Sequence, residues 1–237
     1  MEIINGRKRE LSEQPLNASS VSRRNFLRFT GMAGASAALI ITGCGKTDNG
    51  EGEMGNSGVN LGSSDVGILN YAYALEQLEA AFYTQVALTP YSGISAMEQQ
   101  YLNEIRDHEI AHREFFKNAL GTNAIPGLEV DFTSINFSSR DSVLATAKTF
   151  EDLGVSAYNG AGKLLTNPDY LLLAGKIVSV EARHAATIRD LISNGTFADN
   201  TVIDANGLDK SRSPMEVLQA AATYIKTKIN ASNLPTD

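Results

Sequence analysis

Two copies of one short motif constrain this sequence more than any other feature. Glu109 and His112 are three residues apart, and so are Glu181 and His184. Residues three apart on a helix project from one face, about a turn from each other. The chain has only three histidines, and two of them belong to these motifs. Two such helix faces directed at each other would offer carboxylates and imidazoles to a metal ion, so we expect helices packed around a polar centre.

The motifs are part of a longer internal repeat. Glu76 stands seven residues before Tyr83, and Glu151 stands seven residues before Tyr158. One glutamate–tyrosine helix precedes each Glu-x-x-His helix, so the second half of the chain echoes the first. Two helix pairs of one plan, joined by a crossover, predict a four-helix bundle.

Apolar periodicity and local start and stop signals set the expected helices. Ser95 and Glu98 form a capping box, and Gly121 follows the last periodic residue of that helix. Asn167 with Pro168 marks another helix start. The helices are expected at about 64–89, 95–120, 140–165, 168–194 and 213–230.

The segment 122–138 shows no helical period and is long enough for a crossover. Its seventeen residues reach ~55 Å when extended, whereas a 26-residue helix is ~39 Å long. In the following helix, Gly154, Gly160 and Gly162 each cost ~1 kcal/mol relative to alanine. Three such glycines predict a close helix contact or room for something bulky.

Composition excludes several classes of protein. The net charge is −7 and no basic patch stands out, which argues against nucleic acid binding. The single cysteine excludes an internal disulfide and a cysteine-rich zinc site. Without tryptophan and with 7% aromatic residues, the core must be mostly aliphatic, which favours helices.

The N-terminal residues resemble an export signal with a lipidation site. Arg23 and Arg24 look like a twin-arginine pair, a short apolar run at 31–41 follows, and Cys44 stands where a lipoprotein cleavage box would place it. We expect residues 1–43 to be a signal peptide and 44–63 a flexible tether. The implied partners are the twin-arginine export machinery and, through lipidated Cys44, the membrane, facing the periplasm or the cell exterior. The alternative is an amphipathic N-terminal helix with a buried cysteine.

Three segments resemble the ferritin-like family, in the branch of exported bacterial and desiccation-related proteins. They are 75–83, 150–158 and 180–184. The resemblance covers about 64–195 and leaves 196–237 as a linker and a C-terminal helix. It implies an all-α ferritin-like four-helix bundle with a long crossover between helices two and three, plus a fifth helix.

The bundle would point four carboxylates and two imidazoles inward, and two divalent ions, iron or manganese, would balance the charge. The expected ligands are Glu76, Glu109, His112, Glu151, Glu181 and His184. Helix one leaves a choice between Glu76 and Glu79, and the position of Glu76 relative to Tyr83 favours it. Tyr83 and Tyr158 are either hydrogen-bond donors to the ligands, a role also open to Glu79, or ordinary core residues.

Other interpretations remain open from the sequence. The buried glutamates would pair with lysine or arginine in a metal-free core, and His108 is expected to be a surface or helix-packing residue. Three functions fit: an oxidoreductase acting on oxygen, peroxide or ferrous ion (catalase-, peroxidase- or ferroxidase-like), a metal-binding or storage protein, and a non-catalytic desiccation or stress-related envelope protein. The sequence does not choose between iron and manganese, and it leaves a homo-oligomer open.

Overall fold

The computed structural model describes residues 58–236. The expected signal peptide, with Arg23 and Arg24, and most of the expected tether, with Cys44, lie outside these residues. The described chain contains five α-helices, a 3₁₀ turn and a two-stranded sheet, which confirms the all-α class. In order, the elements are β1 (Val59–Asn60), α2 (Ser64–Leu88), α3 (Ala96–Leu120), η1 (Gly121–Asn123), α4 (Arg140–Gly162), α5 (Pro168–Ile192), α6 (Pro214–Ala221) and β2 (Ile229–Asn230).

The helices begin where local capping chemistry places them. At the start of α3, the Ser95 hydroxyl accepts a hydrogen bond from the Glu98 N–H, and the Glu98 carboxylate accepts one from the Ser95 N–H. At the start of α5, the Asn167 side chain accepts from the Asp169 N–H, with Pro168 at the first helical position. These bonds satisfy backbone donors that have no partner within the helix.

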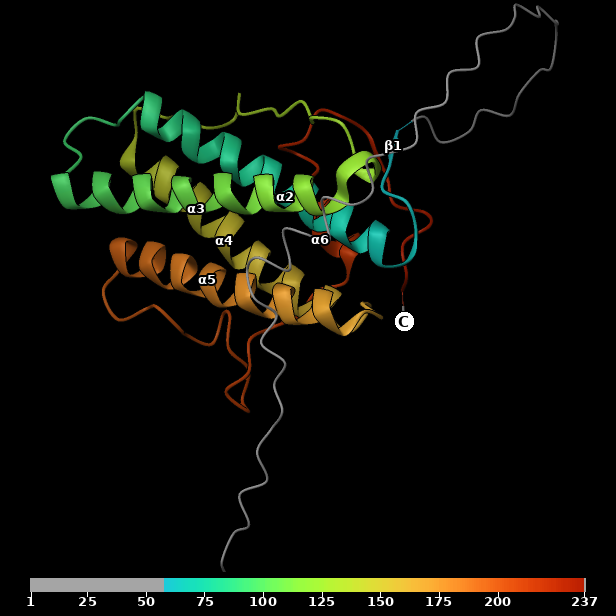
Figure 1. The fold of residues 1–237 in the computed structure, drawn as a ribbon. Helices are drawn as coiled ribbons and strands as arrows, with labels where there is room; N and C mark the ends of the chain where they lie inside the picture. Colours follow the sequence, from blue (N-terminus) through green and yellow to red (C-terminus); the bar gives the residue numbers. More distant parts are fainter. Residues whose placement is uncertain (1–57, 237) are drawn as a thin grey trace, which may run out of the picture. The chain divides into compact units, whose positions relative to one another are not determined.

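The four long helices form two pairs, α2 with α3 and α4 with α5 (Figure 1). The connection 121–139 runs back along the α2–α3 pair, so α4 begins at the end of the bundle where α3 begins. Arg140 confirms this placement, because its Nε donates to Glu98 at 2.7 Å and its guanidinium also donates to the Leu191 carbonyl. The crossover predicted between the second and third long helices is therefore present.

Aromatic side chains of the crossover close the core over α2. The rings of Phe132 and Phe137 each lie 6.0 Å from the ring of Phe82, which in turn meets Phe150 of α4 at 5.1 Å. Phe82 is fully buried. None of the described helices is both long enough and apolar enough to span a lipid bilayer.

The C-terminal helix is shorter than predicted. We expected it to continue to about residue 230, but α6 ends at Ala221. The chain beyond it pairs with the crossover: the Asp131 N–H donates to the Tyr224 carbonyl at 2.9 Å, and the Lys226 N–H donates to the Glu129 carbonyl at 2.8 Å. The β-branched residues of 223–229 suit such extended pairing, and it replaces the hydrogen bonds of further helical turns.

The last residues of the expected tether, from residue 58 on, are described by the structure, and several of them belong to the folded domain. Val59 and Asn60 pair in parallel with Ile229 and Asn230, and Leu61 is fully buried. Residues 59–61 therefore belong to the folded domain, and the flexible segment predicted at 44–63 does not extend over them. The two-stranded pairing joins sequence positions about 170 residues apart, which a local reading could not anticipate.

Gly160 of α4 permits a close backbone approach. A Cβ at this position would lie 1.8 Å from the Arg212 carbonyl oxygen, and the Arg212 N–H donates to the Ser156 carbonyl. At Gly160 the close contact is thus made by the linker before α6. Gly162 is different, because a Cβ there would make an ordinary contact with Leu171.

Candidate metal centre

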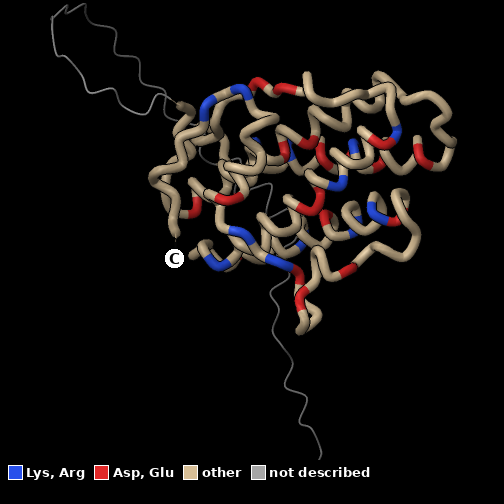
Figure 2. Tube along the Cα trace, turned by 180° about the vertical axis from the view of Figure 1, so that it is seen from behind, with Lys and Arg blue, Asp and Glu red and all other residues tan. Residues whose placement is uncertain are grey.

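Four glutamates, one from each long helix, meet in the middle of the bundle. Glu76, Glu109, Glu151 and Glu181 are each fully buried. In Figure 2, acidic positions lie on the central parts of the helices as well as around the periphery. His112 and His184 lie one helical turn after Glu109 and Glu181, so each imidazole joins the same centre. The structure therefore brings together all six residues expected from the sequence.

The six side chains form two overlapping groups that could each hold a metal ion. The first contains Glu76 and His112, the second contains Glu151 and His184, and both contain Glu109 and Glu181. Within each group the ligand atoms lie within 4.8 Å of one another. An ion with ligand distances of about 2.0 to 2.4 Å spans such a set of atoms. We call these two groups the His112 position and the His184 position.

Each shared glutamate directs one oxygen to each position. Glu109 Oε1 lies 2.8 Å from Nδ1 of His184, and Glu109 Oε2 lies 3.6 Å from Nδ1 of His112. Glu181 Oε1 lies 2.9 Å from Nδ1 of His112, and Glu181 Oε2 lies 3.9 Å from Nδ1 of His184. This arrangement is suited to two carboxylates that bridge a pair of ions.

The inward atoms of the cluster make no hydrogen bonds within the described part of the chain. Buried polar atoms nearly always have a partner, and leaving one without costs about 1 to 3 kcal/mol. Here the atoms without a hydrogen bond are concentrated in one place and face one another, which is the pattern expected of ligand atoms. They are Glu76 Oε2, both oxygens of Glu109 and Glu181, Glu151 Oε2, and Nδ1 of His112 and His184.

Two tyrosines hold the outer oxygens of the unshared glutamates. The Tyr83 hydroxyl of α2 donates to Glu151 Oε1 of α4, and the Tyr158 hydroxyl of α4 donates to Glu76 Oε1 of α2. Both bonds cross between the helix pairs, so each tyrosine orients the glutamate of the opposite half. Such outer partners fix the direction in which a metal-binding carboxylate points.

Burial and mutual repulsion make the acidic cluster unfavourable without cations. Burial raises the pKa of Glu76 to about 7, and burial together with the charge of Glu109 raises the pKa of Glu181 well above its usual range. Burial opposes charge on the histidines as well, but the surrounding carboxylates raise the pKa of His112 to about 12 and that of His184 to about 10. The cluster therefore attracts positive charge, as protons or as metal ions.

Glu79 lies beside the centre but belongs to neither group. It is 4% exposed, and burial, followed by the charge of Glu181, raises its pKa well above the usual range. A Cβ on Gly154 would lie 3.2 Å from Glu79 Oε1 and 3.6 Å from Glu181 Oε2. The glycine of α4 thus leaves room for the Glu79 carboxylate next to a shared glutamate.

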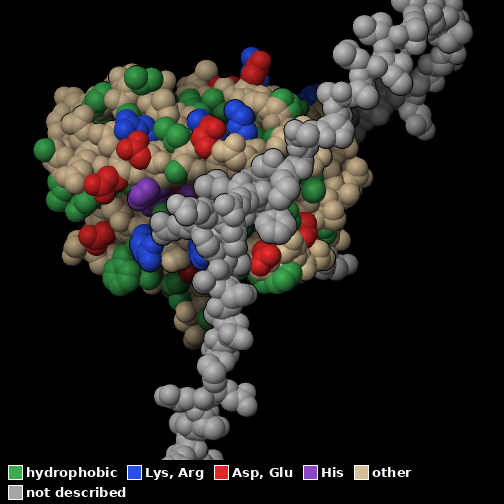
Figure 3. Space-filling model, in the orientation of Figure 1, with side chains coloured by type: hydrophobic (Ala, Val, Ile, Leu, Met, Phe, Trp, Pro, Cys, Tyr) green, Lys and Arg blue, Asp and Glu red, His purple; other side chains and the backbone are tan. Residues whose placement is uncertain are grey.

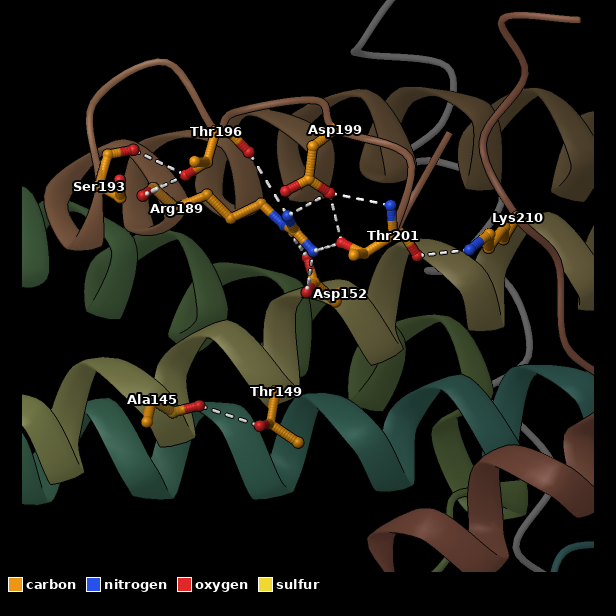
Figure 4. A network of polar contacts seen from close by, with 9 residues as sticks. All are labelled: Ala145, Thr149, Asp152, Arg189, Ser193, Thr196, Asp199, Thr201 and Lys210. Carbon is orange, nitrogen blue, oxygen red and sulfur yellow. Dashed lines mark hydrogen bonds and ion pairs between the residues drawn. The ribbon is translucent and has the colours of Figure 1, made fainter. Parts of the chain in front are cut away.

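No lysine or arginine of the described residues forms an ion pair with the six cluster residues. Arg189 of α5 is only 2% exposed, but its guanidinium binds Asp152 through two bonds of 2.7 Å and also contacts Asp199 and Thr201 (Figure 4). This network fastens the linker after α5 to α4. The alternative that buried glutamates pair with basic side chains is therefore wrong for this cluster.

His108 contacts the cluster from outside. It is an exposed residue of α3, and histidine side chains reach the molecular surface in Figure 3. Its Nδ1 lies 2.8 Å from Nε2 of His184, the ring nitrogen that faces away from the glutamates. The sequence predicts His108 to be a surface or helix-packing residue, but it gives no sign of this contact, because the partner lies on another helix.

One class of four-helix bundles has two helix pairs joined by a crossover and a buried centre of carboxylates and imidazoles. The members of this class are built around paired metal ions. A family model described as a ferritin-like domain matches residues 64–194, more than half of the chain. The chain belongs to the ferritin-like domain family. A search of curated proteins found no matching relative.

Proposed function

We propose that this chain is an exported ferritin-like protein that binds two divalent metal ions, iron or manganese, and acts as an oxidoreductase on oxygen, peroxide or ferrous ion. The observation that carries the proposal is the concentration, in two overlapping groups, of buried carboxylate and imidazole atoms that make no hydrogen bonds within the described residues. Four carboxylates carry a charge of −4, which two divalent ions balance. Carboxylate oxygen and imidazole nitrogen together suit iron and manganese.

The protein residues have separate roles in this proposal. Glu76 and His112 would hold one ion, Glu151 and His184 would hold the other, and Glu109 and Glu181 would contribute to both positions. Bound iron or manganese would supply redox chemistry and polarise an oxygen-containing substrate. Tyr83 and Tyr158 keep the unshared carboxylates aligned, and the packed helices limit access of water.

Metal content tests the binding half of the proposal. The full chain is expected to bind about two ions, and Glu109→Ala and Glu181→Ala should each lose most of both, because each glutamate serves both positions. Glu129→Ala is a matched control, since the Glu129 side chain is 74% exposed and, among the described residues, forms an ion pair with Lys226 alone. Elemental analysis measures the content, and wild-type levels in both cluster variants would overturn the assignment.

Turnover separates an enzyme from a metal-binding protein. The metal-loaded chain is expected to consume hydrogen peroxide, with release of oxygen, or to accelerate oxidation of added ferrous ion. An oxygen electrode and absorbance of ferric product follow the two reactions. A chain that binds two ions but does neither would be a non-catalytic metal-binding or stress-related protein.

A further inference from the structure

The internal repeat is broken at two residues near the metal centre: Glu79 corresponds to Gly154 in the second half, and His108, which contacts a ligand of the centre, corresponds to Val180. His108 precedes Glu109 on α3, whereas Val180 precedes Glu181 at the equivalent place on α5. The rings of His108 and His184 are nearly parallel, at 10°, with centroids 5.1 Å apart and the two nitrogens at 2.8 Å. Among the described residues, His112 has no hydrogen-bond partner on its outer nitrogen, and its side chain is 13% exposed compared with 5% for His184.

The His108 contact has a definite consequence for a metal ligand. His184 directs Nδ1 to Glu109 and Glu151, at 2.8 and 3.6 Å, so Nε2 must carry the proton when Nδ1 binds a metal. His108 Nδ1 then accepts the hydrogen bond from that Nε2–H. A partner on the outer nitrogen fixes both the tautomer and the ring orientation of a ligating histidine. His112 directs the same nitrogen inward but has no such partner in the described chain.

We propose that His108 is a positioning residue that makes the two metal positions unequal, so that the His184 position binds its ion more tightly than the His112 position. The inference rests on the proposed dinuclear site, but it concerns only the difference between its two halves. It assigns a role to an exposed histidine that lies outside both ligand groups.

Metal titration of the full chain, freed of metal by a chelator, tests the inference. With Mn²⁺, the wild type is expected to bind two equivalents of different affinity. His108→Val, which copies the residue of the other half, should weaken the tighter equivalent by about 10- to 100-fold and leave the weaker one unchanged. Glu79 is unchanged in this variant, so its charge does not contribute to the difference in Mn²⁺ affinity between the variant and the wild type.

Two further variants distinguish positioning from general destabilisation. His108→Asn should restore most of the lost affinity, because its Oδ1 is the same number of bonds from Cβ as the histidine Nδ1 and can accept the same bond. Val180→Ala is the matched control and should leave both equivalents as in the wild type.

The outcomes separate this inference from the proposed function. Two equivalents of equal affinity, or a His108→Val chain with wild-type binding, would overturn the role of His108 and leave the dinuclear site standing. Failure of His108→Asn to recover affinity would also overturn it. A wild-type chain that binds no Mn²⁺ and no Fe²⁺ would remove the proposed function itself, and the inference with it.

Discussion

Glu109 and Glu181 occupy equivalent places in the repeat, yet their pKa values move in opposite directions. Burial raises the pKa of Glu181, and the charges of Glu109 and Glu76 raise it further. Burial also opposes ionisation of Glu109, but interactions with the imidazoles of His112 and His184 lower its pKa to about 2. In the absence of metal, the cluster therefore distributes protons among its members, and metal binding must displace some of them.

The first residue-scale prediction concerns pH. The bound proton of His184, whose pKa moves from 6.5 to about 10, stabilises the metal-free fold below pH 6.5, and this contribution is lost as the pH rises towards 10. Glu76, whose pKa moves from 4.5 to about 7, acts in the same direction, because its ionisation costs more in the fold. Thermal melting in chelator should show falling stability from pH 4.5 to 10. A melting temperature that rises across this range would contradict the expectation, and metal-loaded protein should show a smaller slope.

A second prediction compares two buried tyrosines. Tyr83→Phe should lower the free energy of unfolding by about 1 to 3 kcal/mol, because it leaves Glu151 Oε1 buried without its donor. Tyr71→Phe is the control: the Tyr71 hydroxyl is buried and has no hydrogen-bond partner in the described chain, so its removal should cost nothing measurable. Denaturant unfolding of both variants measures the difference, and equal losses would refute the argument.

At the scale of elements, α4 is the helix that joins the parts of the domain. Its first residue, Arg140, binds the start of α3 and the end of α5. Its middle carries Glu151 into the centre, while Asp152 on the next position binds buried Arg189. Its last turns accept the linker before α6 at Gly160. One helix thus connects the crossover, the centre and the C-terminal segment.

The glycines of α4 give a prediction at this scale. Gly160→Ala should destabilise the domain by about 1 to 3 kcal/mol or more, because its Cβ would collide with a backbone carbonyl that cannot move aside. Gly162→Ala should be neutral or slightly stabilising, since alanine favours the helix and its Cβ meets only the tip of Leu171. Chemical denaturation of the two variants checks this, and similar stabilities would contradict it.

At the scale of the whole molecule, strands from the first and last parts of the described domain pair with each other. The pairing of β1 with β2 and of residues 129–131 with 224–226 fixes the C-terminal segment to the entry of α2 and to the crossover. The described domain therefore begins at least five residues before its first long helix. The tether proposed after Cys44 would therefore end before this paired segment.

Export and anchoring are proposals from the sequence, and they have a direct test. Cys44→Ser should move the protein from the membrane fraction to the soluble fraction outside the cytoplasm, because the lipid attachment site is gone. Replacement of Arg23 and Arg24 by lysine should keep it in the cytoplasm. Fractionation with immunoblotting measures both, and unchanged distribution in both variants would refute the proposed signal.

The sequence by itself determined the long helices, the crossover and the six residues of the centre. Helix starts depend on local capping residues such as Ser95 and Asn167, and inward faces follow from a period of 3.6 residues, so both can be read along the chain. The sequence also indicates Glu76 over Glu79 as the ligand from the first long helix, because the repeat aligns Glu76 with Glu151.

Only the tertiary structure decided how these residues meet. It made Glu109 and Glu181 the shared carboxylates, paired each tyrosine with the glutamate of the opposite half, and placed His108 against His184. It also placed a short strand, β2, where the sequence predicted the end of the fifth helix. Each of these contacts joins residues far apart in sequence, and their geometry depends on the packing of helices against each other, which no local pattern encodes.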